Sequence, residues 1–287
     1  MKKIPLDELP RWSKWPARLL NQSEFAPAHR TAGKIEAEYN QDKYAKCLAE
    51  FHRLEGHASP EQIKQFEFGQ PPDQLLCVAM QDELYITSLL EARNAYYRLL
   101  VESLGRRLPE ARSVVELGAG YGFNLWTLKQ RFPDTRFAGG EFSQNAVHLS
   151  SLLNARLPVA QQWSLASFNF YEQDSYRWLG ELPQPVIVFT SHAIEQCPSA
   201  ALVLENLLGF RDRLIAVFHF EPVLELAGDT LLGLLRRRYA EANDYNRDLL
   251  TLIRGNPSIR LQAVRANVFG LNPLNATSVL EWEPALA

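Results

Sequence analysis

The sequence lacks the features that mark secreted, membrane-spanning or nucleic-acid-binding proteins. Its three cysteines in 287 residues are an odd number without metal-ligand spacing, which excludes a disulfide scaffold and favours a reducing compartment. No apolar run is long enough to span a bilayer, and the first residues hold no signal-peptide core. A net charge of −3 gives no electrostatic basis for binding nucleic acid. These absences predict a cytoplasmic protein with a small-molecule substrate and no membrane or nucleic-acid partner. The sequence carries no signal for an oligomeric state.

What is present is an ordinary globular composition with an alternating strand and helix pattern after residue 112. The chain is 46% hydrophobic and 22% charged. Alternation of strands and helices predicts an α/β fold, with a mostly parallel sheet covered on both faces. The expected strands are 113–117, 136–141, 167–172, 186–190, 214–220, 259–268 and 277–282. Helices are expected to begin near Gly122, Ser143, Ser175 and Ser199, and one more covers 229–253. The last two strands have no helix between them, which predicts an antiparallel pair.

The first 108 residues have a different, helical character. Apolar residues recur at three- and four-residue steps over 44–54 and again over 86–104, as on the buried face of an amphipathic helix. Glycine and proline break the pattern at 56–60 and 69–72. The sequence therefore predicts an N-terminal helical cap over 1–108 and a ligand-binding sheet domain over 109–287.

The most informative stretch is Val-Val-Glu-Leu-Gly-Ala-Gly-Tyr-Gly at 114–122. Glycines spaced G-x-G-x-G after a strand allow a tight turn and close approach of the backbone to a ligand. The third glycine comes one residue too early for the dinucleotide pattern, which disfavours a hydride-transferring enzyme. The next strand ends in Glu141, where an acid accepts hydrogen bonds from both ribose hydroxyls in nucleoside-binding sheets. The alternative is that Glu141 only caps the helix beginning near Ser143.

With Glu116 just before the glycine turn, this segment resembles motif I of the class I S-adenosylmethionine (SAM)-dependent methyltransferases, over roughly the last two thirds of the chain. The resemblance implies a Rossmann-like seven-stranded sheet with a C-terminal antiparallel pair and SAM bound against the glycine turn. Asp174, after the third strand, matches the family's contact to the adenine amino group, although it is also an excellent helix N-cap. Phe142 could pack on the adenine or in the core. The expected cofactor contacts are Glu116, Gly118, Ala119, Gly120, Gly122, Glu141, Phe142, Asp174, Ser175 and Ser191.

The fourth strand is expected to end at the reaction centre. In methyltransferases this tip lies closest to the sulfonium and the acceptor, and here it carries His192, whose ordinary pKa near neutrality suits a general base. Glu195, three residues on, could orient the imidazole or act as the base itself. The alternative is that His192 bonds the loop and Glu195 begins the next helix. No third ligand is visible nearby, so no metal is predicted. His219 and Glu221, near the end of strand five, are candidates for the acceptor pocket, unless Glu221 merely ends that strand.

The helical front end is expected to act as a lid that keeps water from the reacting groups. Tyr39 and Tyr44 are candidate catalytic residues whose rings could face the sulfonium, as could Trp12 and Trp15. Arg30 or Lys34 could pair with the carboxylate of SAM or of an acidic acceptor, and Arg30 is the preferred cofactor contact. For each residue taken singly, an ordinary core or surface position in a helical cap is favoured, and one or two of the six are expected to have such a role.

These features predict a methyltransferase that transfers the methyl group of SAM to a hydroxyl or amine of a small molecule such as a sugar, an amino acid or a natural-product intermediate. Positioning of the two reactants and one base would supply the catalysis. An alternative on the same scaffold is a SAM cyclase, which forms azetidine-2-carboxylate and methylthioadenosine and needs no acceptor. A further alternative is a SAM-binding module without catalytic activity.

Overall fold

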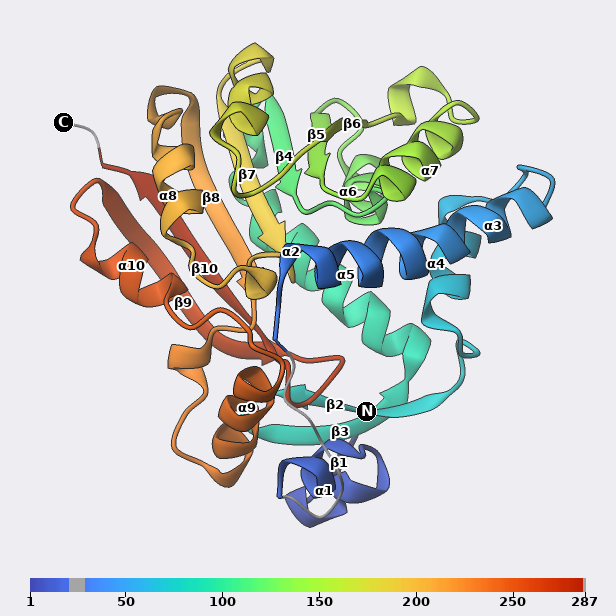
Figure 1. Ribbon diagram of the computed structural model, residues 1–287, viewed down its shortest axis with the longest axis vertical. Helices are drawn as coiled ribbons and strands as arrows, with labels where there is room; N and C mark the ends of the chain where they lie inside the picture. Colours follow the sequence, from blue (N-terminus) through green and yellow to red (C-terminus); the bar gives the residue numbers. More distant parts are fainter. Residues whose placement is uncertain (21–28, 286–287) are drawn as a thin grey trace.

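A seven-stranded sheet with the strand order β6-β5-β4-β7-β8-β10-β9 forms the centre of the molecule (Figure 1). The computed structural model describes residues 1–20 and 29–285. Only β10 runs antiparallel to its neighbours β8 and β9, because a short connection joins it to β9. This order confirms the predicted fold class, including the closing antiparallel pair. The strands are β4 (Ser113–Leu117), β5 (Arg136–Glu141), β6 (Ser164–Ser167), β7 (Val186–Ser191), β8 (Leu214–Glu221), β9 (Ile259–Phe269) and β10 (Thr277–Pro284).

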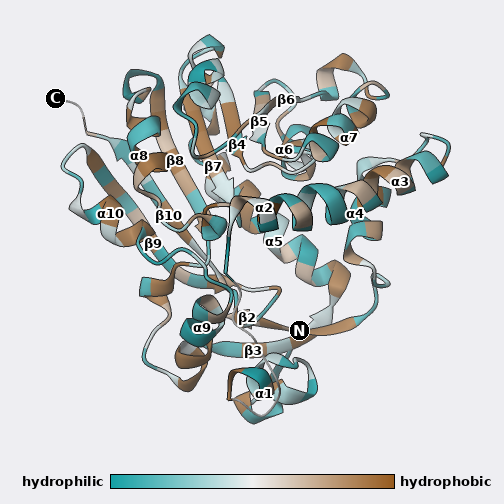
Figure 2. Ribbon diagram, viewed as in Figure 1, coloured by the Kyte–Doolittle hydropathy of each residue, from teal (hydrophilic) through white to brown (hydrophobic). Residues whose placement is uncertain are grey.

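Helices cover both faces of this sheet, which is why its central strands are continuous apolar runs rather than alternating ones. Neighbouring residues of β4 enter different cores: Val114 packs with the cluster under α5, α6 and α7, and Val115 with the cluster under α8 and α10. β4 and β7 are mostly hydrophobic, brown in Figure 2. The covering helices are α5 (Leu89–Gly105), α6 (Phe123–Arg131), α7 (Gln144–Asn154), α8 (Ala201–Leu208) and α10 (Leu249–Gly255). The helix α9 (Leu231–Ala242) packs instead in a third cluster, with Ile4, Leu9 and Leu84 of the N-terminal segment.

The N-terminal segment is mainly helical, as expected, but it also contains a small antiparallel sheet that the sequence pattern did not reveal. Its strands are β1 (Lys2–Ile4), β2 (Leu75–Met80) and β3 (Glu83–Ser88), in the order β1-β3-β2. The predicted helix over 86–104 therefore begins later, at Leu89, where the Ser88 hydroxyl accepts a hydrogen bond from the Glu91 backbone N–H. Ile86 has the spacing of the helix face that follows, but it belongs to β3.

The other helices of this segment are α1 (Trp15–Leu19), α2 (Ala32–Ile35), the π-helix η2 (Glu36–Tyr44), α3 (Ala45–Arg53) and α4 (Pro60–Phe68). Figure 1 shows α2, η2 and α3 as one continuous run that passes across the arrow ends of β4 and β7. The described residues also include short 3-10 helices: η1 (Leu6–Arg11), η3 (Leu108–Glu110), η4 (Val159–Gln161), η5 (Gln173–Glu181), η6 (Ile194–Gln196), η7 (Arg211–Arg213) and η8 (Leu224–Leu226). No helix among the described residues is long and apolar enough to cross a membrane.

Two predicted elements differ from the structure for identifiable reasons. The strand expected at 167–172 lies at Ser164–Ser167, because the chain turns after it through hydrogen bonds around Asn169. The helix expected over 229–253 is broken into α9 and α10. Asn246 causes the break: its side-chain oxygen accepts hydrogen bonds from the backbone N–H groups of Asp248 and Leu249 and so caps α10.

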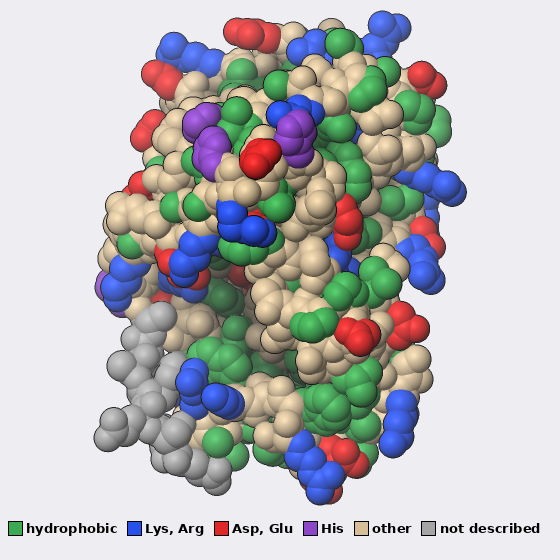
Figure 3. All heavy atoms as spheres, turned by 90° about the vertical axis from the view of Figure 1, so that its right-hand side faces the viewer, with side chains coloured by type: hydrophobic (Ala, Val, Ile, Leu, Met, Phe, Trp, Pro, Cys, Tyr) green, Lys and Arg blue, Asp and Glu red, His purple; other side chains and the backbone are tan. Residues whose placement is uncertain are grey.

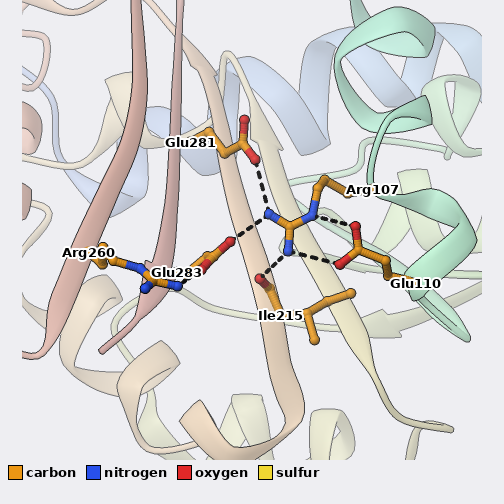
Figure 4. Close-up of polar contacts among 6 residues, drawn as sticks. All are labelled: Arg107, Glu110, Ile215, Arg260, Glu281 and Glu283. Atoms are coloured by element: carbon orange, nitrogen blue, oxygen red, sulfur yellow. Dashed lines mark hydrogen bonds and ion pairs between the residues drawn. The ribbon is translucent and has the colours of Figure 1, made fainter. Parts of the chain in front are cut away.

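An arginine-centred network ties the end of α5 to the last strand (Figure 4). The Arg107 guanidinium lies 2.6 Å from Glu283, 3.4 Å from Glu281 and 3.1 Å from Glu110, and it donates to the Ile215 carbonyl oxygen at 3.1 Å. Only 20% of the Arg107 side chain is exposed. Its carboxylate partners on β10 flank Trp282, a fully buried residue. The network therefore holds β10 in register beside the helical layer.

Candidate functional site

The glycine turn after β4 has the conformation that its composition predicts. Gly118 and Gly120 have φ angles of +78° and +55°, in the left-handed region that other residues rarely adopt. A Cβ atom at Gly118 would lie 2.4 Å from the Cβ of Ala193, and one at Gly120 would lie 2.5 Å from the Tyr44 hydroxyl. Both positions therefore require glycine for the backbone angle and for close contact with the β7 tip and the π-helix.

The carboxylate of Glu141, at the tip of β5, holds this turn in place. One oxygen accepts the Gly120 N–H at 2.7 Å and the other accepts the Ser143 N–H at 2.8 Å. Burial raises the pKa of Glu141, and the backbone N–H groups oppose that rise. The N-cap of α7 is Ser143 itself, whose hydroxyl accepts from the Ala146 N–H. Glu141 thus does more than cap a helix: it joins the tips of β4 and β5.

Glu116, the last but one residue of β4, is buried with an unsatisfied oxygen. Its Oε1 accepts a hydrogen bond from Asn124 at 2.6 Å, whereas its Oε2 has no hydrogen-bond partner among the described residues. Only 1% of Glu116 is exposed, and burial raises its pKa to about 8. An unpaired buried carboxyl oxygen is costly and is expected to meet a donor supplied by a ligand.

A cavity of about 450 Å³ opens at the carboxyl ends of β4, β5 and β7, where ligands bind in open α/β sheets. Its size is typical of small-molecule sites. The predicted site residues that line it are Tyr39, Tyr44, Glu116, Gly118, Ala119, Gly120, Glu141, Phe142, Ser191, His192 and Glu195. One cavity therefore unites residues from the glycine turn, the tips of β5 and β7, and the π-helix η2.

His192 and Glu195 form a hydrogen-bonded pair at the β7 tip. The imidazole Nδ1 lies 3.0 Å from the Glu195 carboxylate, and Nε2 lies 2.7 Å from the Thr277 hydroxyl. Asn275 also donates to Glu195, at 3.1 Å, so the connection between β9 and β10 completes the pair. His192 has a φ of +52°, uncommon for a residue with a side chain, which aims the imidazole into the cavity.

The Glu195 charge controls the titration of this histidine. Burial alone would lower the pKa of His192, but the charge and hydrogen bond of Glu195 outweigh burial and raise it above its ordinary value. Glu195 itself is held by the turn beneath it. The buried carboxyl group of Glu221 accepts the backbone N–H groups of Ala193 and Ile194 at 3.0 and 3.1 Å. Burial, followed by the Glu195 charge, raises the pKa of Glu221 to about 7.

His219 does not reach the cavity, so its predicted place in the acceptor pocket is wrong. It is fully buried within β8, where Thr190 contacts its Nδ1 at 3.0 Å and the Trp282 indole N–H donates to its Nε2 at 3.0 Å. Glu221 does not line the cavity either; its carboxyl group accepts backbone N–H groups of the turn that follows β7.

Four predicted cofactor contacts lie outside the cavity lining. Asp174 pairs with Arg177 on the surface, with 75% of its side chain exposed. The Ser175 hydroxyl donates to the Asn169 carbonyl oxygen at 2.6 Å and so shapes the preceding loop. Gly122 packs against Trp163, whose Nε1 would lie 2.1 Å from an added Cβ.

Arg30 is the fourth predicted cofactor contact that lies outside the cavity lining. Its guanidinium pairs with Glu38 at 2.6 Å and lies over the Tyr245 ring at 5.4 Å. The remaining lid candidates, Trp12, Trp15 and Lys34, also lie outside the lining.

The sequence pattern missed several residues that the structure brings to the cavity. Asn169 lies in the loop after β6 and lines the cavity, whereas Asp174, five residues further along the chain, does not. Tyr96 on α5 hydrogen-bonds Ser191 through its hydroxyl at 2.6 Å. Asn275 comes from the β9–β10 connection. Of these, only Asn169 lies near an expected site residue, since it falls in the segment after the third strand where an acid was expected to contact the adenine.

No family model and no curated protein matches the sequence. Solved structures with a similar fold include the pyocyanin biosynthetic protein PhzM, at 17% identity and a TM-score of 0.49 over 69% of this chain and 56% of that one. This chain thus spans just over half the length of PhzM. Magnesium protoporphyrin IX methyltransferase (ChlM) from Synechocystis is 12% identical with a TM-score of 0.48, over 69% of this chain and 87% of that chain.

A third similar structure is geranyl diphosphate C-methyltransferase from Streptomyces coelicolor, at 12% identity and a TM-score of 0.47, over 69% of this chain and 81% of that chain. The strand order of the sheet, rather than any of these matches, identifies the fold as a Rossmann-like α/β sheet with a closing antiparallel strand pair.

Proposed function

We propose that the protein is a SAM-dependent methyltransferase that acts on a hydroxyl or amine of a small molecule. One observation carries the proposal: a single cavity joins a glycine turn and a ribose-type acid to a histidine–carboxylate pair. SAM, when bound, supplies an electrophilic methyl group on a sulfonium. The small-molecule class is supported by the face seen in Figure 3, where basic and acidic side chains are interspersed rather than gathered into a basic patch.

The residues around the cavity fit SAM. The free Oε2 of Glu116 suits an ammonium group such as that of the methionine part, since a cation would return this carboxyl to its charged form. Each carboxylate oxygen of Glu141 accepts one backbone N–H and retains a further lone pair, so ribose hydroxyls can bond both. Phe142, Asn169 and Ala119 complete the nucleoside side of the cavity.

His192 is proposed as the general base. In its neutral form, Nδ1–H donates to the Glu195 carboxylate, which leaves a lone pair on Nε2. Thr277 contacts that nitrogen in the structure, and a substrate hydroxyl or amine in its place would transfer its proton there. Glu195 then stabilises the imidazolium, as it already raises the pKa of His192. Tyr96 and Ser191, hydrogen-bonded to each other, stand beside the imidazole and restrict its movement.

The N-terminal segment is proposed as the lid over residues 109–287, the SAM-binding and catalytic part. Asn40 of the π-helix accepts the Asn145 N–H at 2.9 Å and the Ser143 hydroxyl at 2.8 Å, which docks the lid on the start of α7. Tyr39 and Tyr44 then form part of the cavity wall and exclude water from it. The three cysteines are buried and free, which fits the reducing cytoplasm.

The test begins with purified protein and SAM alone, followed by SAM with pools of sugars, amino acids and hydroxylated or aminated metabolites, with products identified by mass spectrometry. We expect SAM to bind and remain intact until an acceptor receives the methyl group. Formation of azetidine-2-carboxylate and methylthioadenosine without an acceptor would replace methyl transfer by cyclisation. Glu141→Ala serves as the binding control: losing charge-assisted hydrogen bonds should weaken SAM affinity about tenfold or more by calorimetry. Failure of the wild type to bind SAM would refute the proposal.

A further inference from the structure

A second polar cluster lies in the cavity wall, away from the β7 tip. Glu67 on α4 holds two ammonium groups: Lys43 of the π-helix lies 2.7 Å from its Oε1, and Lys64 on α4 lies 2.9 Å from its Oε2. The Tyr121 hydroxyl, from the glycine turn, donates to the same Oε2 at 3.1 Å. All four residues line the cavity. Lid, helix and glycine turn thus meet at one carboxylate.

This cluster carries two positive charges against one negative charge. Burial by itself would raise the pKa of Glu67, but the two ammonium groups hold it well below its ordinary value. The pKa of Lys43 is raised well above its usual range despite burial, through Tyr44 and Glu67. Glu67 is therefore ionised and Lys43 is charged at neutral pH, and the cluster holds two lysine side chains for one carboxylate.

Aromatic rings hold both lysines in position. The Lys43 ammonium lies 5.2 Å from the Tyr44 ring centroid, and that of Lys64 lies 5.3 Å from Phe68 and 5.4 Å from Phe123. Only 18% of the Lys64 side chain is exposed. A cation fixed by a carboxylate and by ring faces loses little further freedom when an anion binds, which favours binding.

Lys43 and Lys64 are the only lysine or arginine side chains among the described residues that line the cavity. The other acidic and histidine side chains of the lining are Glu116, Glu141 and the His192–Glu195 pair, which lie at the strand tips. Apart from His192, an anionic group of any ligand in this cavity has cationic partners only in the lysine cluster.

We propose that the cluster of Lys43, Lys64 and Glu67 is the carboxylate-binding subsite of the cavity. The identity of the carboxylate rests on the proposed function: it belongs either to the methionine part of SAM or to an acidic acceptor. Glu67 spaces the two ammonium groups, and the ligand carboxylate neutralises the charge that Glu67 leaves unpaired. The cluster, rather than Arg30 or Lys34, then fixes the anionic end of the ligand.

The experiment uses Lys64→Met, which removes the charge but keeps an unbranched apolar side chain, and leaves Glu67 paired with Lys43 and Tyr121. Lys43→Met is the second variant. Lys46→Met is the matched control, because Lys46 pairs with Asp42 on the exposed side of the same helical run and does not line the cavity. Thermal unfolding establishes that each variant is folded.

Calorimetric titrations with S-adenosylhomocysteine and with methylthioadenosine, which lacks the amino-acid part, separate the two sources of the carboxylate. If it belongs to the cofactor, Lys64→Met weakens S-adenosylhomocysteine about tenfold or more and leaves methylthioadenosine unchanged. If it belongs to the acceptor, both nucleosides bind as before, and malonate binds wild-type protein holding S-adenosylhomocysteine but not the Lys64 variant.

Unchanged nucleoside affinities in both lysine variants, together with no lysine-dependent binding of malonate, would overturn the subsite. A wild-type protein that binds neither nucleoside would instead refute the proposed function, and malonate titrated into the protein alone would still decide the role of the lysines. Lys46→Met should match the wild type in every titration.

Discussion

Two histidines on neighbouring parallel strands have opposite environments. His219 lies within β8 and pairs in register with Thr190 of β7, whereas His192 stands two residues beyond Thr190, where β7 has ended. His219 has only neutral partners, and burial lowers its pKa to about 3. His192 has a carboxylate partner, and its pKa is raised. A shift of two positions along the chain thus separates a structural histidine from a candidate base.

The difference shows that burial alone does not decide a histidine's chemistry. Both side chains are desolvated, and desolvation disfavours the charged form of each. Glu195 reverses that effect for His192. The chain turns just after β7, where Glu221 accepts three backbone N–H groups, and this turn brings the Glu195 carboxylate next to the imidazole. Inside β8 the ladder leaves no room for such a turn.

The largest expected effect comes from removing the base. His192→Asn retains a residue that tolerates the left-handed backbone angle but cannot take up the proton. Turnover should fall about a hundredfold or more, with S-adenosylhomocysteine affinity unchanged. Steady-state kinetics and calorimetry measure the two effects, and His148→Asn, on the exposed face of α7, is the control. Normal turnover in His192→Asn would show that His192, like His219, has no role as a base in the reaction.

The opposite result is expected for the second histidine. His219→Leu removes the acceptor of the buried Trp282 indole N–H and the partner of Thr190, so the free energy of unfolding should fall by about 2–3 kcal/mol. Urea denaturation measures this loss. The pH dependence of catalysis should stay as in the wild type; a shifted profile would place His219 in the reaction after all.

The stability of the wild type should also depend on pH through His219. Its pKa is about 3 when folded and about 6.5 when unfolded, so below pH 6.5 the unfolded chain binds more protons. The free energy of unfolding therefore falls as pH decreases from about 6.5 toward 3. His219→Leu should remove that part of the slope. An identical slope in the variant would show that other groups cause the acid sensitivity.

A smaller effect is expected from Glu195→Gln. The substitution keeps an oxygen for the Nδ1–H bond but removes the charge that raises the pKa of His192. Wild-type kcat/KM should fall with decreasing pH through a pKa above 6.5, and in the variant this acid limb should move to lower pH. Maximal turnover should drop about tenfold, since the imidazolium loses its counter-charge. An unmoved limb would assign it to another group.

The smallest effect is expected from Arg107→Ala, which loosens the strand that carries Trp282. Its network is partly exposed, so the free energy of unfolding should fall by only about 1 kcal/mol in urea denaturation, and the pH profile of catalysis should not change. Arg238→Ala, which breaks an exposed pair with Glu241, is the matched control with an effect near zero. Equal effects in both variants would show that the Arg107 network does not stabilise the strand whose Trp282 donates to His219.

Much of the sheet could be predicted from local sequence. The bounds expected for β4 and β5 agree with the structure, because each is a short run with an acid at or next to its last residue, followed by a turn. The glycine turn and Glu141 followed from the same local pattern. The small sheet of β1, β2 and β3 did not, because β1 pairs with β3 across about 80 residues, and in the β2–β3 hairpin Ile86 mimics the spacing of the helix that follows.

What the sequence by itself determined is the α/β class, the glycine turn and the acids at the tips of β4 and β5, since each depends on residues close together in the chain. Tertiary structure alone decided which side chains share the cavity. Thr277 and Asn275 reach His192 and Glu195 across 85 and 80 positions, and Lys43 and Lys64 meet at Glu67 from two helices. The physical reason is that charge, burial and hydrogen-bond partners act through space, and only packing sets those distances.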